Sequence, residues 1–253
     1  MVPLHSRSAW IWSVVVAGAS ALALFATRSL VKTSGAAPTQ SLAAVQPVAA
    51  VDVPVPPFAE SDARLRDALS GVSPRELFHR WLKADHLLDR LAVVTVNLAE
   101  DESPRAQLSF LRPDRPFKAA HGAISPSSYG RYDPFANVIS SLDERRVAAT
   151  YRTLHPLLES AYHALGYPGR PLDGAVTRAL QRIASAPVRE DVAVHRVGSL
   201  WLYTDARLES LGPVEKQLLR MGPRNTRLLQ QTAREIAGAL GFSLKASPVA
   251  DSR

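Results

Sequence analysis

The stretch YGRYDPFANVISSLDERRVAATYRTLHPLLESAYHALGYP, residues 129–168, carries the strongest helical pattern of the chain. Asp143 stands where an N-cap is expected, and apolar side chains then recur every three or four residues. Gly166, followed by Pro168, is typical of a helix C-terminus. The pattern predicts a long amphipathic helix, kinked at Pro156, and therefore a helical fold.

The preceding residues continue the helical pattern. Ser61 as N-cap and Gly71 as terminator predict a short helix. Ser73 and Glu76 have the spacing of a capping box, with Pro74 between them at the first helical position. Apolar residues then fall at alternating spacings of four and three from Leu77 to Leu98, which predicts one continuous helical face.

Shorter elements complete the predicted domain. Asp133 before Pro134 predicts the N-cap of a short helix that runs through Ser140, and residues 99–128 are expected to form a long connection. Gly198-Ser199 between two β-rich runs predicts a tight hairpin. Further helices are expected within 172–187, 212–223 and 224–241. The predicted fold class is mainly α, a helical domain with one small β-hairpin.

The N-terminal region has a different character. Residues 8–27 contain no charged side chain and are long enough to cross a bilayer as a helix, with Trp10 and Trp12 at one end and Arg28 and Lys32 beyond the other. We interpret this segment as a transmembrane anchor that contacts the lipid of a bacterial inner membrane. A cleaved signal peptide is the alternative. The short N-terminal tail favours export of the domain to the periplasm.

The composition between anchor and domain predicts a tether. Residues 33–58 are rich in Ala, Val and Pro, carry one charge and lack any helical or strand period, which is typical of a disordered linker. The predicted organisation is therefore an N-terminal tail and anchor at 1–32, a linker at 33–58, a helical domain at 59–241 and a flexible C-terminal tail at 242–253.

Charge and composition restrict the function classes. The chain has 253 residues, no cysteine and a net charge of +7. Without cysteine, a disulfide framework, a zinc–thiolate site and a cysteine nucleophile are excluded. The basic residues are mixed with acidic ones and do not form a dense stripe with interleaved aromatic residues, so nucleic acid is not expected as a partner.

Several segments in order resemble a known family. RYDP (131–134), LHPLLESAYHALGYP (154–168), LWLYTDARLESL (200–211) and KQLLRMGPRN (216–225) make the chain similar to the bacterial membrane-anchored family known as domain of unknown function 3014. The resemblance spans roughly residues 58–240, although His155 stands where a tyrosine is expected. It implies location and fold, and it transfers no functional residue.

No recognised catalytic motif is present. The sequence lacks a Gly-Lys phosphate loop, an HExxH helix and a GxSxG elbow, and no cofactor is predicted. His155, Glu159 and His163, spaced by four, form a weak metal candidate on one helical stripe. A second weak candidate is the trio His79, His86 and Asp89. A solvated helix face is the simpler interpretation of both, so no metal site is predicted.

Two function hypotheses follow. The first is a non-enzymatic envelope protein whose helical domain binds or scaffolds a partner protein, and the second is an envelope hydrolase or ligand-binding sensor. The YGRYDP and LLRMGP segments both lie where one helix follows another and both combine Arg with aromatic or Met side chains. We predict that they form one polar-aromatic patch that binds an acidic group, made by Arg131, Tyr132, Asp133, Tyr203, Arg220 and Asn225. The alternative is that each arginine only satisfies nearby helix-end carbonyls.

Overall fold

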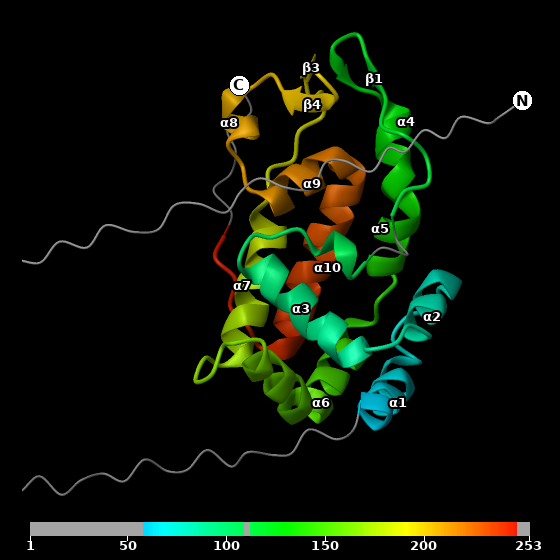
Figure 1. The fold of residues 1–253 in the computed structure, drawn as a ribbon, viewed down its shortest axis with the longest axis vertical. Helices are drawn as coiled ribbons and strands as arrows, with labels where there is room; N and C mark the ends of the chain where they lie inside the picture. Colours follow the sequence, from blue (N-terminus) through cyan, green and yellow to red (C-terminus); the bar gives the residue numbers. More distant parts are fainter. Residues whose placement is uncertain (1–57, 109–111, 247–253) are drawn as a thin grey trace, which may run out of the picture. The chain divides into compact units, whose positions relative to one another are not determined.

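The computed structural model describes residues 58–108 and 112–246, which form a mainly helical domain (Figure 1). The predicted anchor and nearly all of the predicted linker lie outside the described residues. The helices fall into a longer and a shorter group. The longer ones are α1 (Phe58–Leu69), α3 (Leu87–Ala99), α6 (Glu144–Ala164), α7 (Leu172–Ser185), α9 (Pro213–Met221) and α10 (Pro223–Leu240). The shorter ones are α2 (Glu76–Leu82), η1 (Pro104–Ala106), α4 (Pro126–Tyr129), η3 (Gly130–Tyr132), α5 (Asp133–Ile139) and α8 (Ala206–Glu209).

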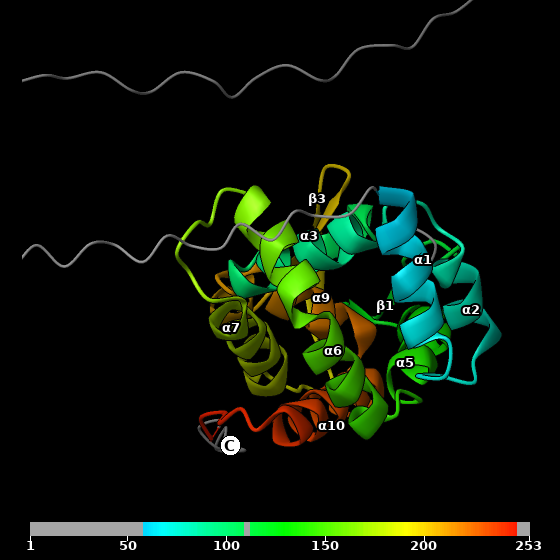
Figure 2. The ribbon, with the colours of Figure 1, turned by 90° about the horizontal axis from the view of Figure 1, so that it is seen from below.

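The start and the end predicted for helix α6 are confirmed. The carboxylate of Asp143 accepts a hydrogen bond from the backbone N–H of Arg146, as an N-cap should. The helix continues past Pro156 and ends before Gly166, whose φ of 97° is the left-handed conformation expected there. Helix α6 lies between α7 and α1 in Figure 2 and also contacts α3 and α10, so the stretch that predicts the fold joins several helices of the domain.

The predicted continuous helix from Leu77 to Leu98 is wrong. The chain forms α2 and α3 with a turn between them, and His86 in this turn has a φ of 58°. The break is stabilised by the buried Asp62, whose carboxylate accepts backbone N–H groups of His86 at 2.8 Å and of Leu87 at 2.8 Å. A carboxylate on α1 therefore caps α3, which a local apolar period cannot reveal.

Other predicted caps are shifted. Helix α1 begins at Phe58, before the predicted cap Ser61. The capping box of Ser73 is not formed, because α2 begins only at Glu76 and the Ser73 hydroxyl pairs with that of Ser141 at 2.7 Å. Asp133 is the first residue of α5 instead of its N-cap, and its carboxylate contacts α10. At Ser73 and Asp133 a tertiary partner takes the place of the local cap.

Two hairpins, rather than the single one predicted, lie at one end of the domain. β3 (Val194–Val197) pairs antiparallel with β4 (Leu200–Tyr203) around Gly198, which confirms the predicted hairpin. β1 (Ala119–Ala120) pairs with β2 (Ala123–Ile124) inside the predicted connection. The strands β1 and β2 are too short for an alternating apolar pattern to be visible in the sequence. A bridge between Ala123 and Ala193 joins the two hairpins.

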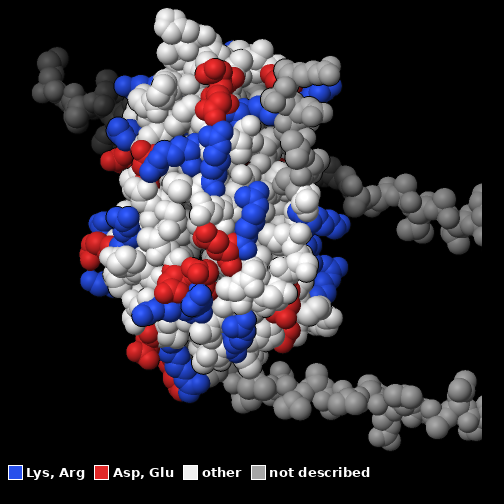
Figure 3. Space-filling model, turned by 180° about the vertical axis from the view of Figure 1, so that it is seen from behind, with Lys and Arg blue, Asp and Glu red and all other residues white. Residues whose placement is uncertain are grey.

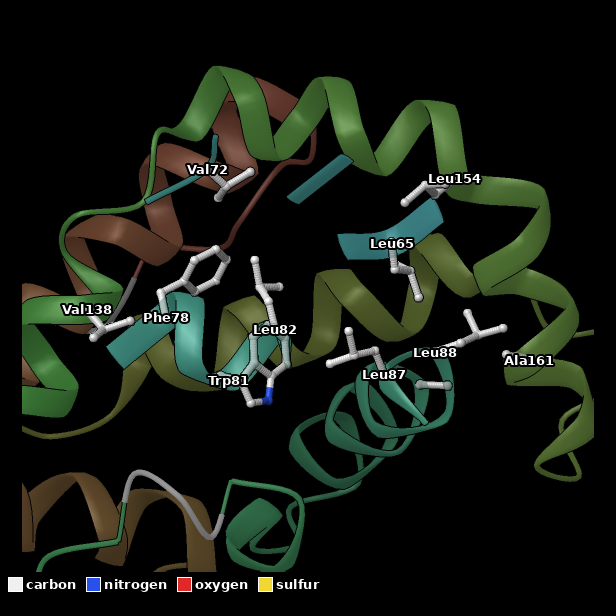
Figure 4. Close-up of a cluster of buried hydrophobic side chains, with 11 residues drawn as sticks. Leu65, Val72, Phe78, Trp81, Leu82, Leu87, Leu88, Val138, Leu154 and Ala161 are labelled. Carbon is white, nitrogen blue, oxygen red and sulfur yellow. The ribbon is translucent and has the colours of Figure 1, made fainter. Parts of the chain in front are cut away.

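The core is divided into separate clusters. The largest gathers buried side chains from α1, α2, α3, α5 and α6, and Figure 4 shows members such as Leu65, Phe78 and Trp81. A second cluster, around Leu218 and Leu229, joins α5, α9 and α10. None of the helices in the described ranges, 58–108 and 112–246, combines the length and the apolar composition needed to cross a membrane.

The chain after α10 folds back on the domain. Phe242 lies edge-on to the ring of Tyr151 on α6, and the backbone of Lys245 exchanges hydrogen bonds with the Gln181 side chain on α7. These residues belong to the segment for which a flexible tail is predicted. The remainder of that segment, 247–253, lies outside the described residues.

Candidate functional site

An apolar cavity of about 370 Å³ lies between the two core clusters. Nearly every long helix contributes to its wall. Its lining is almost entirely aliphatic or aromatic, and its polar side chains are limited to Ser103, Gln217 and Thr232. The lining includes Trp81 on α2, Leu91 on α3, Val138 on α5, Val147 on α6, Ile183 on α7, Leu218 on α9 and Ala233 on α10. The volume falls within the range of about 300–1,000 Å³ that is usual for small-molecule sites.

The cavity arises because the small residues of α7 make its tightest contacts. Ala175 and Ala179 are buried against Ala99 on α3 and Tyr162 on α6. The larger Leu180 and Ile183, together with Ile236 on α10, line the cavity and are only partly buried. The sequence pattern predicts the large residues of α7 as its core face. In the structure Leu180 and Ile183 line the cavity, and Ile183 also packs against the second cluster.

A smaller cavity of about 90 Å³ adjoins the large one and extends it to the surface. Pro104, Leu108, Phe135, Gln217 and Met221 line both cavities. The remaining lining of the smaller cavity is different in character and consists of Arg105, Arg112, Pro113 and Tyr132. We call this smaller cavity the mouth. Among the described residues, Tyr132 is the only member of the predicted patch that lines either of these two cavities.

The structure brings the two halves of the predicted patch together through Asn225. This side chain is 1% exposed, and its amide donates to the Asp133 carboxylate at 2.9 Å, to the Met221 carbonyl at 3.0 Å and to the Tyr129 carbonyl at 3.2 Å. Its oxygen accepts from the guanidinium of Arg224 at 2.9 Å. Asn225 therefore fastens the start of α10 to α4 and α5 from the inside.

Arg131 and Arg220 occupy the two ends of the same neighbourhood. Arg131 donates to the carbonyls of Ser128 at 3.0 Å and Arg115 at 2.9 Å, and it stacks over the ring of Phe117 at 5.6 Å. It also stacks over Tyr132 at 5.1 Å. Arg220 donates to the carbonyl of Trp201 at 3.3 Å and stacks over Tyr203 at 5.8 Å. The rings of Phe117 and Trp201 touch, with centroids 5.7 Å apart, and join the two ends.

This arrangement favours a structural role for both arginines, since their guanidinium groups satisfy carbonyls of the chain itself. Binding of an acidic partner at the patch stays a prediction. On the face shown in Figure 3, basic and acidic side chains are interspersed over most of the surface. The absence of a nucleic-acid partner likewise stays a prediction from composition.

Tyr203 makes the stability of the folded domain depend on pH. Its hydroxyl donates to the Lys216 carbonyl at 2.8 Å, and burial raises the pKa of Tyr203 to about 12, although nearby Arg220 opposes the shift. The neutral phenol is thus favoured in the folded state. Between pH 10 and 12 the unfolded chain loses a proton that the folded chain keeps, so stability is complete below pH 10 and falls as pH rises.

We expect this group to lower the free energy of unfolding by about 2 kcal/mol between pH 10 and 12. Urea denaturation at a series of pH values measures the slope, and Tyr203→Phe is the matched variant. The slope should be shallower in the variant, with a remainder from Tyr129 and Tyr151, whose pKa values burial also raises. Equal slopes in the two proteins would contradict the assignment to Tyr203.

Neither group of candidate metal ligands forms a metal-binding arrangement in the described residues. His155 lies 3.0 Å from the Asp173 carboxylate and 3.8 Å from that of Glu159, while His163 contacts the carbonyl of Arg170. His86 of the second candidate lies 3.8 Å from its predicted partner Asp89. Across residues 58–108 and 112–246, no group of three or more His, Asp or Glu side chains is placed to hold a metal ion.

A cluster of acid and base groups surrounds Asp173. Its carboxylate oxygen accepts from the Tyr151 hydroxyl and contacts His155, in a shallow depression beside Phe242. Burial raises the pKa of Tyr151, so this phenol stays protonated and does not act as a base. The described lining of the depression contains no Ser, Thr or Lys side chain that would serve as a nucleophile. The hydrolase hypothesis gains no support from this geometry.

Comparison with known proteins places the chain in a family but assigns no activity. The family described as Protein of unknown function (DUF3014) matches residues 87–237, from the first residue of α3 into α10. Helices α1 and α2 precede the matched region. Neither the curated proteins nor the solved structures provide a match.

Proposed function

The chain belongs to the DUF3014 family, and we propose that its helical domain is a non-enzymatic module that binds an apolar small molecule inside the helical bundle. The observation that supports this most strongly is the cavity of about 370 Å³. Its described wall combines apolar side chains from eight α-helices with very few polar groups, which is the composition of a site for a hydrocarbon-like ligand.

The energetic cost of an unfilled cavity supports the proposal. At roughly 24 cal/mol per Å³, a cavity of 370 Å³ corresponds to about 9 kcal/mol of lost packing. This figure is comparable with the whole stability of an ordinary domain, which is about 5–15 kcal/mol. An apolar occupant would restore much of the lost contact, since each buried methylene contributes about 0.8 kcal/mol. Ligand binding and domain stability should therefore be coupled.

Trp81 provides the test, because it lines the cavity whereas Trp201 lies in β4 and does not. The full chain carries Trp10→Phe and Trp12→Phe, because both tryptophans lie in the apolar segment 8–27 and would add their own signal. It is kept in a fluorinated surfactant that mixes poorly with hydrocarbon and is titrated with dodecanol brominated near its chain end. We expect saturable quenching of tryptophan fluorescence that is largely lost in Trp81→Phe. Trp201→Phe is the matched control and should keep it. Quenching that is unchanged by Trp81→Phe would show that the chain binds elsewhere.

The setting of this module remains our proposal from the sequence. The uncharged segment 8–27 and the Pro-rich residues 33–58 support a single-pass anchor and a tether, with the domain in the periplasm of a bacterial cell and a partner protein in the envelope. A domain that carries an apolar molecule from or to a membrane would benefit from such a tether.

Protease added to intact spheroplasts tests this topology. We expect digestion of the helical domain while an N-terminal fragment stays in the membrane fraction, because the domain lies outside the cytoplasmic membrane. A marker protein in the cytoplasm should remain intact as the control. A domain that is protected until the cells are lysed would show that the orientation is the opposite one.

A further inference from the structure

We propose that the ligand is a single-chain amphiphile with an anionic head group, and that Arg105 and Arg112 hold this group at the mouth. The inference rests on the proposed function and adds the chemical class of the ligand. The large cavity itself offers no charged side chain. A fully apolar ligand would need nothing more, but the mouth that adjoins the cavity has a different lining.

The mouth combines an apolar floor with a basic rim. Phe135 and Met221 line both the mouth and the large cavity, so a hydrocarbon chain can pass from one to the other along apolar surface. Arg105 and Arg112 also line the mouth and are exposed, which places their side chains at the boundary with water. Tyr132 lines the mouth as well, and its hydroxyl accepts from Arg131 at 3.5 Å.

The charges at the rim are unbalanced. Within residues 58–108 and 112–246, no carboxylate lines the mouth or the large cavity. Among the described residues, neither Arg105 nor Arg112 makes an ion pair or a side-chain hydrogen bond, whereas Arg131 is engaged by the carbonyls of Ser128 and Arg115. Two guanidinium groups without internal partners favour a carboxylate or a phosphate, which arginine binds in a bidentate manner.

The position of the arginines also restricts the shape of the ligand. The head group must stay at the surface while the tail lies inside, and the mouth of about 90 Å³ has room for one small head group. A neutral chain would leave both arginines unused, and a cationic head would be repelled. Fatty acids and single-chain phosphates share the required chemistry, and the experiment distinguishes them.

The test compares four bromine-labelled chains of equal length: dodecanoate, dodecyl phosphate, dodecanol and dodecyltrimethylammonium. Each is titrated at pH 8 into the full chain in fluorinated surfactant, with Trp81 quenching as the readout. We expect at least one anionic chain to bind tenfold or more tightly than dodecanol, and the cation to bind most weakly. The tighter anion identifies the head group.

The paired variant Arg105→Gln with Arg112→Gln should bring the anionic chain to within about twofold of dodecanol and leave dodecanol unchanged. The matched control is Arg64→Gln with Arg207→Gln, which removes the same charge from exposed positions that line neither cavity. Anions that bind no more tightly than dodecanol, or a preference that persists in the paired variant, would overturn the inference while the apolar site stands. If no chain quenches Trp81, the proposed function itself fails.

Discussion

An Ala233→Phe variant should melt at a higher temperature than the wild-type protein and bind dodecanol at least tenfold more weakly. Ala233 is 3% exposed, lies on α10 and lines the cavity, so an added ring would enter the cavity instead of colliding with a packed neighbour. Burial of the ring contributes about 1.5–3 kcal/mol, which corresponds to a rise of roughly 4–8 °C in Tm for a domain of this size. Scanning calorimetry and Trp81 quenching measure the two effects.

Ala237, one turn further along α10, is the matched control. It is 1% exposed and lines neither the large cavity nor the mouth, so Ala237→Phe should overpack the core and lower stability by about 1–3 kcal/mol. Ala-to-Phe substitution in α10 is therefore expected to raise stability at position 233 and to lower it at position 237. If Ala233→Phe destabilises the protein as much as Ala237→Phe does, the space is not available in solution.

A Gly222→Ala variant should show the largest loss of stability, about 3–5 kcal/mol by the sum of backbone strain and overpacking. Gly222 joins α9 to α10 with a φ of 83°, and a β-carbon there would lie 2.5 Å from Cγ of Tyr129. Because Asn225 binds the Tyr129 carbonyl close by, movement of Tyr129 would disturb that buried amide as well. Urea denaturation of the full chain measures the loss.

Gly241→Ala is the control that measures the cost of the left-handed backbone conformation without a steric contact. Gly241 has nearly the same φ, 82°, and nothing lies within 4 Å of the position of a β-carbon. We expect this variant to lose only about 1 kcal/mol. Similar losses in the two variants would mean that the contact between Gly222 and Tyr129 contributes nothing.

Elements with local signals could be predicted from the sequence. Helix α6 is defined by Asp143 at its start and Gly166 at its end, and the β3–β4 hairpin is defined by its turn at Gly198. The stop at Gly222 separates α9 from α10 in the same way. These signals depend only on neighbouring residues, so they can be recognised in the sequence without knowledge of the tertiary structure.

Features that depend on distant partners could not be predicted. The break before α3 depends on Asp62, which lies 24 residues before His86, and apolar periodicity continues across it. The cavity has no local signal at all. It exists because Ala175 and Ala179 pack closely while Leu180 and Ile183 face the space between clusters. Hydrophobic patterns show that a residue is apolar, but they do not show whether it meets a neighbour or a cavity.

The predicted patch lies between these two cases. The sequence predicted that the segments where one helix follows another would meet, and Asn225 does contact Asp133 at 2.9 Å. The sequence could not show that nearby carbonyls accept hydrogen bonds from Arg131 and Arg220. Nor could it show that Arg105 and Arg112 line the mouth of a cavity. The latter pair lies in the segment read as a connection, where no periodic pattern draws attention to them.

Intermolecular nuclear Overhauser effects between dodecanol and the methyl groups of the full chain show directly whether the ligand lies inside the helical domain. We expect contacts from the dodecanol chain protons to Ile183, Leu218 and Leu229, which line the cavity. We expect none to Val197 and Leu200, which are 51% and 63% exposed on the hairpin and would report nonspecific surface binding. Contacts to the hairpin residues without contacts to the cavity residues would contradict the proposal of an internal apolar site.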